Sequence, residues 1–212
     1  MKSIVIGAHL RREDVEPLAR AIPSADLFLS AVPVAEQQAL GDRELLLHVA
    51  QTRARLLEKA TFLAIRYGFT ISSDDDARAR TAAHVAQWKA TLEAHGDRVE
   101  MTLKVAAASP RARPDRREFT SGAEYLKALH AATHGASVDP QFGEQVEQRM
   151  VPLAVQHRWS HRDEKSIELA MLVDRASIDQ VREAGEALKA TGVAFLLSGP
   201  WPLEVFADAD RE

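Results

Sequence analysis

The chain has 212 residues, a formal net charge of −4 and no cysteine. This length corresponds to one large domain or two small ones, and a hydrophobic fraction of 46% is ordinary for a protein with a packed core. The absence of cysteine excludes disulfides, thiolate nucleophiles, iron–sulfur clusters and cysteine-type zinc sites. The mildly acidic charge argues against a general nucleic-acid-binding protein, which is usually strongly basic.

Targeting and membrane segments are not expected. The apolar run at residues 3–8 is shorter than the roughly 7–15 residues of a signal peptide. No window approaches the roughly 20 apolar residues of a membrane-spanning helix. We therefore expect a cytoplasmic protein that does not bind a lipid membrane.

The first half of the chain mixes strand and helix patterns. Apolar and β-branched runs predict strands, and apolar residues at helical spacing predict helices. In chain order we expect a strand over 3–8, a helix over 10–21, a strand over 26–34, a helix capped by Asp42 and an extended segment over 64–72. A single helix is then expected from the Ser/Asp cluster at 72–76 to about residue 95, followed by Gly96 in the left-handed conformation.

The second half opens with a clear alternation over 98–105. Its apolar positions point one way and its polar positions the other, which predicts a strand with one wet face; the polar positions are Glu100, Thr102 and Lys104. The elements expected after it are a basic loop at 107–119, helices at 121–132 and 140–150, strands at 151–159 and 166–173, a helix at 177–190 capped by Ser177, and a strand at 193–197.

The element order from residue 98 onward is βαββαβ, which is typical of the ferredoxin-like fold. We therefore predict an α+β protein of two domains. Residues 1–97 form a mixed α+β N-terminal domain, and residues 98–212 form a ferredoxin-like C-terminal domain with extra helices and a tail.

Two polar clusters are weak candidates for a metal site. His157 and His161 are four residues apart, but they fall on a predicted strand, where that spacing does not place two ligands together. Asp74, Asp75 and Asp76 lack the alternation and the glycine of a calcium loop, so helix capping is the better interpretation. No metal site is therefore predicted.

The sequence contains no nucleotide-binding loop and no Gly-x-Ser-x-Gly motif, so neither an enzyme nor a cofactor is predicted. The segment Gly199–Pro202 is not a phosphate loop, because its two prolines lack backbone N–H donors. Trp201, held between them, either packs on its own domain or anchors a partner. The arginines of the loop at 111–117 either steer an acidic partner or are simply solvated.

Several segments together resemble the GvpF/GvpL family of gas vesicle proteins, in the same order over residues 1–206. The matching motifs are Arg66-Tyr67-Gly68-Phe69, Glu100-x-x-x-Lys104-Val105, Gly122-x-x-Tyr125-Leu126, Leu172-Val173-Asp174-Arg175 and Gly199-Pro200-Trp201-Pro202 with Phe206. The chain departs from the family pattern at Tyr67, where phenylalanine is usual, and at residues 203–205, where Leu-Glu-Val replaces Pro-Tyr-Ser.

The resemblance implies a two-domain α+β protein that serves gas vesicle formation in the prokaryotic cytoplasm as an accessory or minor structural protein. The implied partners are the hydrophobic shell protein GvpA and other gas vesicle accessory proteins, and no catalytic residue or cofactor goes with the family. The residues expected to bind a partner or to hold the motifs in place are Arg66, Tyr67, Gly68, Glu100, Lys104, Tyr125, Gly199, Pro200, Trp201, Pro202 and Phe206. The alternative is a ferredoxin-like small-ligand-binding or enzymatic domain, which would need a concave pocket with converging polar groups.

Overall fold

A computed structural model describes residues 2–35, 38–106, 114–134, 140–162, 166–190 and 193–204, with the side chains of 130–140 left aside. Internal contacts divide the chain into two units. The first contains Met1–Glu100 and Pro200–Glu212, and the second contains Met101–Gly199. The division into domains at 1–97 and 98–212 stays a prediction, but the contacts group the tail from Pro200 onward with the first unit.

The first unit is built on a five-stranded sheet with the order β2-β3-β1-β4, in which β5 also pairs with β1. The pairings of β1 with β3, β4 and β5, and of β2 with β3, are antiparallel. All seven residues of β1 are buried, which requires cover on both faces of the sheet. The strands are β1 (Ser3–His9), β2 (Arg20–Ser24), β3 (Leu27–Pro33), β4 (Leu63–Ala64) and β5 (Thr70–Ile71).

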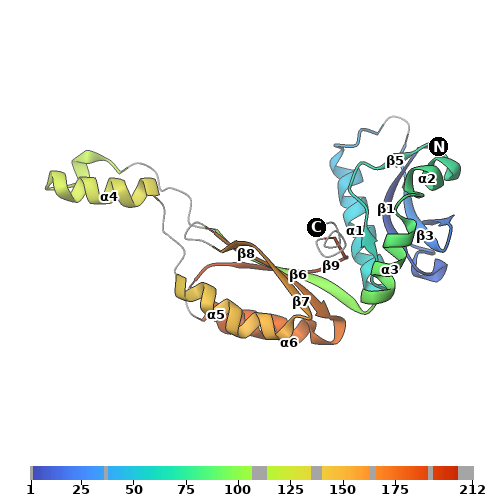
Figure 1. The fold of residues 1–212 in the computed structure, drawn as a ribbon. Coiled ribbons are helices and arrows are strands. Elements are labelled where there is room, and N and C mark those ends of the chain that lie inside the picture. The colour runs from blue at the N-terminus through green and yellow to red at the C-terminus, as the bar shows by residue number, and fades with distance from the viewer. Residues whose placement is uncertain are drawn as a thin grey trace. The chain divides into compact units, whose positions relative to one another are not determined.

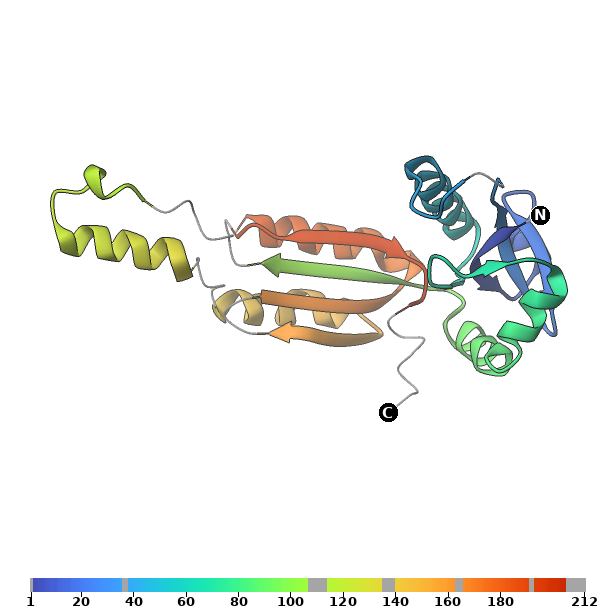
Figure 2. The same ribbon diagram turned by 90° about the horizontal axis from the view of Figure 1, so that it is seen from above.

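Three helices provide this cover: α1 (Arg43–Lys59), α2 (Asp74–Thr81) and α3 (Val85–His95). Helix α1 lies on one side of the sheet, and α2 and α3 lie on the other (Figures 1 and 2). Asp42 caps α1 as predicted, because its side chain accepts hydrogen bonds from the amides of Glu44 and Leu45.

The helix predicted over 10–21 is wrong. Only a 3-10 turn forms, at Arg12–Asp14, and the chain then enters β2 at Arg20. Pro17 explains this result, because proline lacks the N–H that a helix interior needs and its ring clashes with the preceding turn.

The single helix predicted from residue 72 to 95 is also wrong, since the structure divides it into α2 and α3. Thr81, at the end of α2, is fully buried and lies within hydrogen-bonding distance of the Ser24 hydroxyl, at 3.2 Å. This contact ties the end of α2 to β2. Gly96 follows α3 with a φ of −58°, so it is right-handed and not left-handed as predicted.

The second unit contains a four-stranded sheet with the order β7-β8-β6-β9. Neighbouring strands run in opposite directions, and α5 (Pro140–Met150) and α6 (Ile178–Lys189) cover one face (Figure 2). The strands are β6 (Arg98–Ala106), β7 (Gln156–Arg162), β8 (Ser166–Asp174) and β9 (Leu196–Trp201), and α4 (Gly122–His134) lies between β6 and α5 in the sequence.

The core of the second unit forms where alternate residues of β6 and β8 meet these two helices. The buried members are Met101, Leu103, Val105, Phe142, Val146, Met150, Ile167, Leu169, Met171, Val173, Val181 and Leu188. The predicted alternation of β6 is confirmed for its apolar side. On the polar side Lys104 is exposed, whereas Glu100 is only 3% exposed, so the expectation of a wet face is wrong at Glu100.

Smaller differences between the predicted and the observed elements concern their bounds and one helix cap. Strand β7 starts at Gln156 and not at residue 151, because Val151–Leu153 forms a 3-10 turn that contains Pro152. Strand β9 continues through Trp201. Ser177 occupies the N-cap position of α6 but its side chain makes no capping hydrogen bond. The predicted mixed α+β class is confirmed, with two sheets and six α-helices in the described residues.

Candidate functional site

An apolar groove of about 420 Å³ lies on the first unit along one stripe of α1. The stripe repeats at helical spacing, so its members share one face of the helix; they are Leu46, Val49, Ala50, Arg53, Ala54 and Leu57. Val49 and Leu57 are buried, whereas Leu46 is 42% exposed and its neighbour Leu47 is 50% exposed. Helix α1 therefore presents more apolar surface than its packing on the sheet uses.

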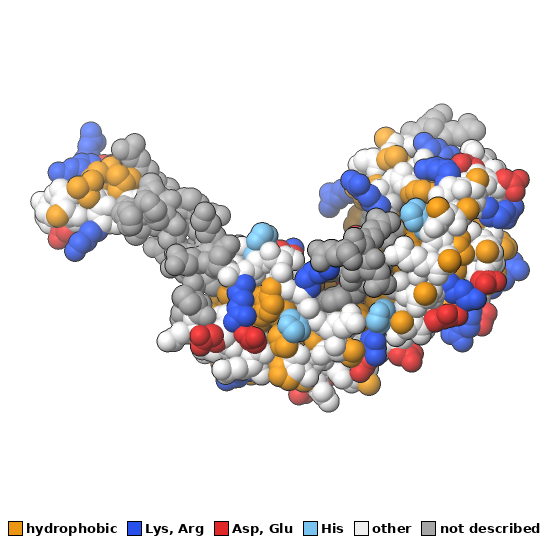
Figure 3. All heavy atoms as spheres, in the orientation of Figure 1, with side chains coloured by type: hydrophobic (Ala, Val, Ile, Leu, Met, Phe, Trp, Pro, Cys, Tyr) orange, Lys and Arg blue, Asp and Glu red, His pale blue; other side chains and the backbone are white. Residues whose placement is uncertain are grey.

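The opposite wall of the groove is the segment Pro200–Pro202 with Glu204, and Ala64 and Tyr67 complete the lining. Trp201 is 50% exposed, so the indole is neither fully packed nor free in solvent. Figure 3 shows acidic and basic side chains interspersed over the visible face of the first unit, with only small hydrophobic patches between them. Against such a surface, a groove lined by leucine, alanine, proline and tryptophan is distinctive.

Backbone hydrogen bonds hold the wall in place. The amide of Leu203 donates to the carbonyl of Phe62 at 3.0 Å, and the amide of Ala64 donates to the carbonyl of Leu203 at 3.0 Å. These two bonds form a parallel bridge to Leu63 of β4, and the Leu203 side chain is completely buried. Leu203 is therefore held in place by two hydrogen bonds, and Trp201 lies two residues before it in the sequence.

Glu100 adds a third hydrogen bond to this wall. Its buried carboxylate accepts a hydrogen bond from the backbone amide of Glu204 at 2.7 Å. The resemblance marked Glu100 as a motif residue, and the structure brings it to the Gly-Pro-Trp-Pro motif through this contact. A charged acceptor for a backbone donor is a strong form of hydrogen bond.

Arg53 is the one cation in the described lining of the groove. Its Nε donates to the carbonyl of Ile6 at 3.2 Å, and its Nη2 donates to the carbonyl of Ile65. Burial lowers the pKa of Arg53, and the nearby charge of Glu204 opposes that shift. The guanidinium thus links α1 to β1 and to the residue that follows β4.

The turn Arg66–Phe69 positions Tyr67. The amide of Phe69 donates to the carbonyl of Arg66 at 3.3 Å, and Gly68 has a φ of +94°. A turn with positive φ at its third residue favours glycine there. The Tyr67 hydroxyl donates to the carbonyl of Leu40 at 2.6 Å, which fixes the ring at the edge of the groove.

Other predicted site residues do not belong to this groove. Lys104 Nζ lies 2.7 Å from Glu168 Oε1, which is an ion pair across the sheet of the second unit. Tyr125, on α4, contacts the ring of Phe119 at 6.0 Å and lies beneath the guanidinium of Arg116 at 5.3 Å. Gly199, with a φ of +122°, precedes the groove wall in β9. Phe206, and Arg111 and Arg113 of the basic loop, lie outside the described residues.

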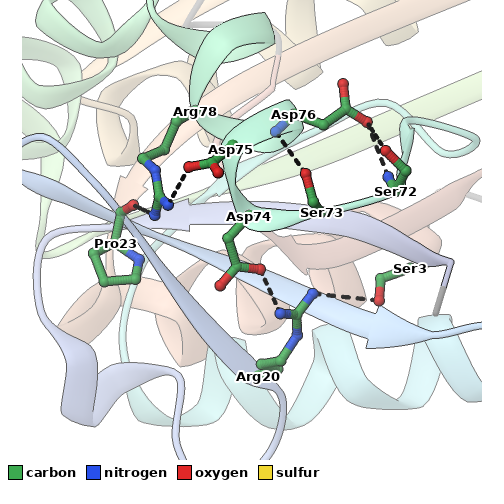
Figure 4. Close-up of polar contacts among 9 residues, drawn as sticks. All are labelled: Ser3, Arg20, Pro23, Ser72, Ser73, Asp74, Asp75, Asp76 and Arg78. Atoms are coloured by element: carbon green, nitrogen blue, oxygen red, sulfur yellow. Dashed lines mark hydrogen bonds and ion pairs between the residues drawn. The ribbon is translucent and has the colours of Figure 1, made fainter.

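The aspartate cluster caps α2 and ties it to the sheet (Figure 4). The Ser73 hydroxyl accepts from the amide of Asp76, and the Asp76 carboxylate accepts from both the amide and the hydroxyl of Ser72. Asp74 pairs with Arg20 at 2.5 Å, and Asp75 pairs with Arg78 at 2.7 Å. The capping interpretation is confirmed for Ser73 and Asp76, whereas Asp74 and Asp75 form ion pairs.

Sequence reasoning missed the α1 side of the groove. It used Leu46, Val49 and Leu57 only as markers of a helix, and it did not single out Arg53 or the two alanines. The available signal was the run Leu45-Leu46-Leu47. Three consecutive leucines cannot all face one side of a helix, so at least one must point away from the core.

Comparison with known proteins decides the family. The sequence profile described as "Gas vesicle synthesis protein GvpL/GvpF" matches residues 15–207. The chain belongs to this family. The resemblance noted in the sequence is therefore confirmed, and membership of the GvpL/GvpF family implies a role in gas vesicle formation.

Two crystal structures of gas vesicle protein GvpF share the fold. The protein from Microcystis aeruginosa gives a TM-score of 0.69 at 11% identity, covering 97% of this chain and 98% of that chain. The protein from Anabaena sp. PCC7120 gives a TM-score of 0.69 at 13% identity, covering 98% and 96%. No match was found among curated protein sequences. In the described residues, no helix is long and apolar enough to cross a membrane.

Proposed function

We propose that this protein is a non-catalytic accessory or minor structural protein of gas vesicle formation that binds the hydrophobic shell protein GvpA through the apolar groove of its first unit. The observation that carries the proposal is the groove itself. It combines half-exposed Leu46 and Trp201 with a wall that three hydrogen bonds hold in place.

The chemistry of a shell subunit fits such a groove. A protein that lines a gas space exposes large apolar surfaces before it assembles, and such surfaces aggregate in water. A partner that covers part of that surface needs a preformed apolar recess with little reorganisation on binding. An amphipathic helix laid in a groove, with apolar side chains at helical spacing, is a common form of this recognition.

The fold of the second unit does not by itself decide between a binding role and a catalytic one. Its strand order β7-β8-β6-β9, with α5 and α6 on one face, supports the ferredoxin-like description. That fold hosts many unrelated functions, so function has to be argued from a site and not from the fold. The described lining of the groove offers mainly apolar contact area, and its arginine is engaged in hydrogen bonds to the backbone, which favours binding over chemistry. We place the protein in the cytoplasm, at the forming gas vesicle.

Two variants of the groove test this proposal. Leu46→Asp puts a charge on the α1 wall and Trp201→Ala removes the opposite anchor. Each variant should abolish co-purification with GvpA and vesicle formation in a deletion strain while the folded protein remains. Val155→Asp provides a matched control, because Val155 is 44% exposed and belongs to the second unit. Normal vesicles with both groove variants, or no association of the wild-type protein with GvpA at physiological salt, would contradict the proposal.

A further inference from the structure

A second cleft, of about 440 Å³, lies on the first unit between the β4–β5 segment and helices α2 and α3. Its lining holds two arginines and a histidine, whereas the groove has one arginine. The residues that matter are Arg66, Phe69, Arg80, His84 and Trp88. None of these five side chains is fully buried, so packing in the core of the unit does not account for their position.

Arg80 is a fixed part of the wall. Its Nη1 donates to the carbonyl of Thr70, and its guanidinium lies over the ring of Phe69, 4.2 Å from the ring centre. The distance is typical of a cation–π contact. The positive charge at this position is therefore held in one orientation.

His84 and Trp88 form the facing wall. Their rings stack with centroids 5.4 Å apart and planes 16° apart, one helical turn from each other at the start of α3. The stack holds a polar imidazole beside a flat apolar surface. A ligand with a charged group next to methylene carbons would contact both.

Arg66 differs from Arg80 in having no hydrogen bond or ion pair to its side chain among the residues that the structure describes. It is exposed at the mouth of the cleft, on the turn that Gly68 shapes. Glu204 is the single acid in the described lining, and its charge acts on Arg53 on the groove side. The described lining thus holds two arginines and one acid, and the charge of Asp76 acts on Arg80 from outside the lining.

We propose that this cleft binds a carboxylate side chain of the protein partner whose apolar residues occupy the groove. Arg66 donates to the carboxylate, and the His84–Trp88 stack contacts the adjacent methylene groups. Ala64 and Glu204 line both recesses, so the cleft and the groove lie next to each other at the β4 edge of the sheet. One short partner segment with apolar and acidic residues can therefore reach both. The inference rests on the proposed function in taking the ligand to be a segment of the protein that the groove binds.

The three tryptophans of the chain allow a direct test. Trp88 lines the cleft, Trp201 lines the groove, and Trp159 lies in β7 of the second unit. Labelling the full chain with 5-fluorotryptophan gives one fluorine NMR signal for each site, assigned with Trp88→Phe and Trp201→Phe. The probes are the peptide acetyl-Leu-Ala-Leu-Glu-Ala-Glu-Leu-amide, its counterpart with glutamine at both glutamates, and sodium acetate.

The glutamate peptide should move the Trp88 signal saturably, and the glutamine peptide should not. Arg66→Gln should weaken binding about tenfold, as expected for one charge-assisted contact. Arg55→Gln should leave it unchanged, because Arg55 is exposed on α1 and lines neither recess.

Three results would overturn the inference: equal binding of both peptides, no effect of Arg66→Gln, or an acetate response as strong as that of the peptide. The last would mean a site for small free anions. None of these results would contradict the proposed function if GvpA still co-purifies with the wild-type protein and not with Trp201→Ala. Conversely, loss of that association with an intact peptide response would count against the proposed function alone.

Discussion

The carboxylate of Glu100 and the backbone amide of Glu204 lie 2.7 Å apart, although 104 positions separate them in the sequence. The acid is 3% exposed, on a strand whose polar side was expected to be wet. Its burial is explained by the donor that it accepts from, since a buried charge is tolerated when it is hydrogen-bonded. This contact fixes the chain directly after the Gly-Pro-Trp-Pro motif.

Replacing Glu100 with glutamine should destabilise the protein. The amide keeps the shape of the side chain but replaces a charge-assisted hydrogen bond with a weaker neutral one. We expect a loss of about 1–3 kcal/mol in the free energy of unfolding, measured by urea denaturation. Glu204→Gln is the matched control, because it leaves the backbone amide in place. An equal loss in both variants would show that the Glu204 side chain, and not its amide, carries the effect.

Trp201→Ala separates self-packing from partner binding. The indole is half exposed, so its loss should lower the free energy of unfolding by about 2 kcal/mol or less. If the groove binds a partner, vesicle formation should fail although the melting temperature falls only slightly. Thermal unfolding and microscopy of vesicles give the two readouts. A large drop in melting temperature with normal vesicles would instead assign Trp201 to the fold alone.

The elements that followed from local pattern were predicted well. The strand at Ser3–His9 and the helix at Arg43–Lys59 have periodic apolar residues, and Asp42 supplies a cap that sequence can reveal. The failures depend on tertiary context. The divide between α2 and α3 falls at Ala82-Ala83-His84, where no glycine or proline marks it, and it is fixed by the buried contact of Thr81 with Ser24.

The candidate site could be predicted only in part. Motif resemblance found Glu100, Tyr67 and Trp201, and the structure brings all three to one groove or its wall. The resemblance could not identify the groove residues of α1. Their exposed side becomes the wall of a groove only because residues 200–204, far away in the sequence, lie opposite them. The pairing of Leu203 with Leu63 joins residues 140 positions apart, and no local pattern encodes that contact.

Acid should weaken the fold through His9. The ring is fully buried, accepts or donates one hydrogen bond with Ser30 at 3.0 Å, and stacks on Phe62 at 4.9 Å. Burial lowers the pKa of His9 from 6.5 to about 3. Between pH 6.5 and about pH 3 the imidazole of His9 binds a proton in the unfolded chain but not in the folded chain. The stability that comes from burying neutral His9 is therefore fully present above pH 6.5 and is lost as the pH falls below it.

The expected loss in the free energy of unfolding is large enough to measure. The loss should approach 1.4 kcal/mol per pH unit below 6.5, or roughly 2 kcal/mol between pH 7 and pH 5. His9→Gln cannot titrate, so the difference in unfolding free energy between these two pH values should shrink by about that amount. His48→Gln, on the exposed side of α1, should leave the difference unchanged. An unchanged pH dependence in His9→Gln would contradict the assignment.

Gly7 should tolerate no side chain, for a reason of packing and not of backbone conformation. A Cβ at this position would lie 2.5 Å from Cδ2 of Phe62 and 3.1 Å from Oγ of Ser30. Phe62 is fully buried and stacks on His9, so it cannot move aside without disturbing the core. We expect Gly7→Ala to cost about 1–3 kcal/mol, as overpacking of a dense core does.

Two further variants make this prediction specific. Gly41→Ala is the control, because a Cβ there meets nothing within 4 Å, and it should be neutral or slightly stabilising. Phe62→Leu in the Gly7→Ala background should recover part of the loss, since the smaller side chain makes room for the added methyl group. Unfolding free energies of the four proteins give a double-mutant cycle for Gly7 and Phe62. Additive losses would show that the clash is relieved elsewhere and that Phe62 does not set the size limit at Gly7.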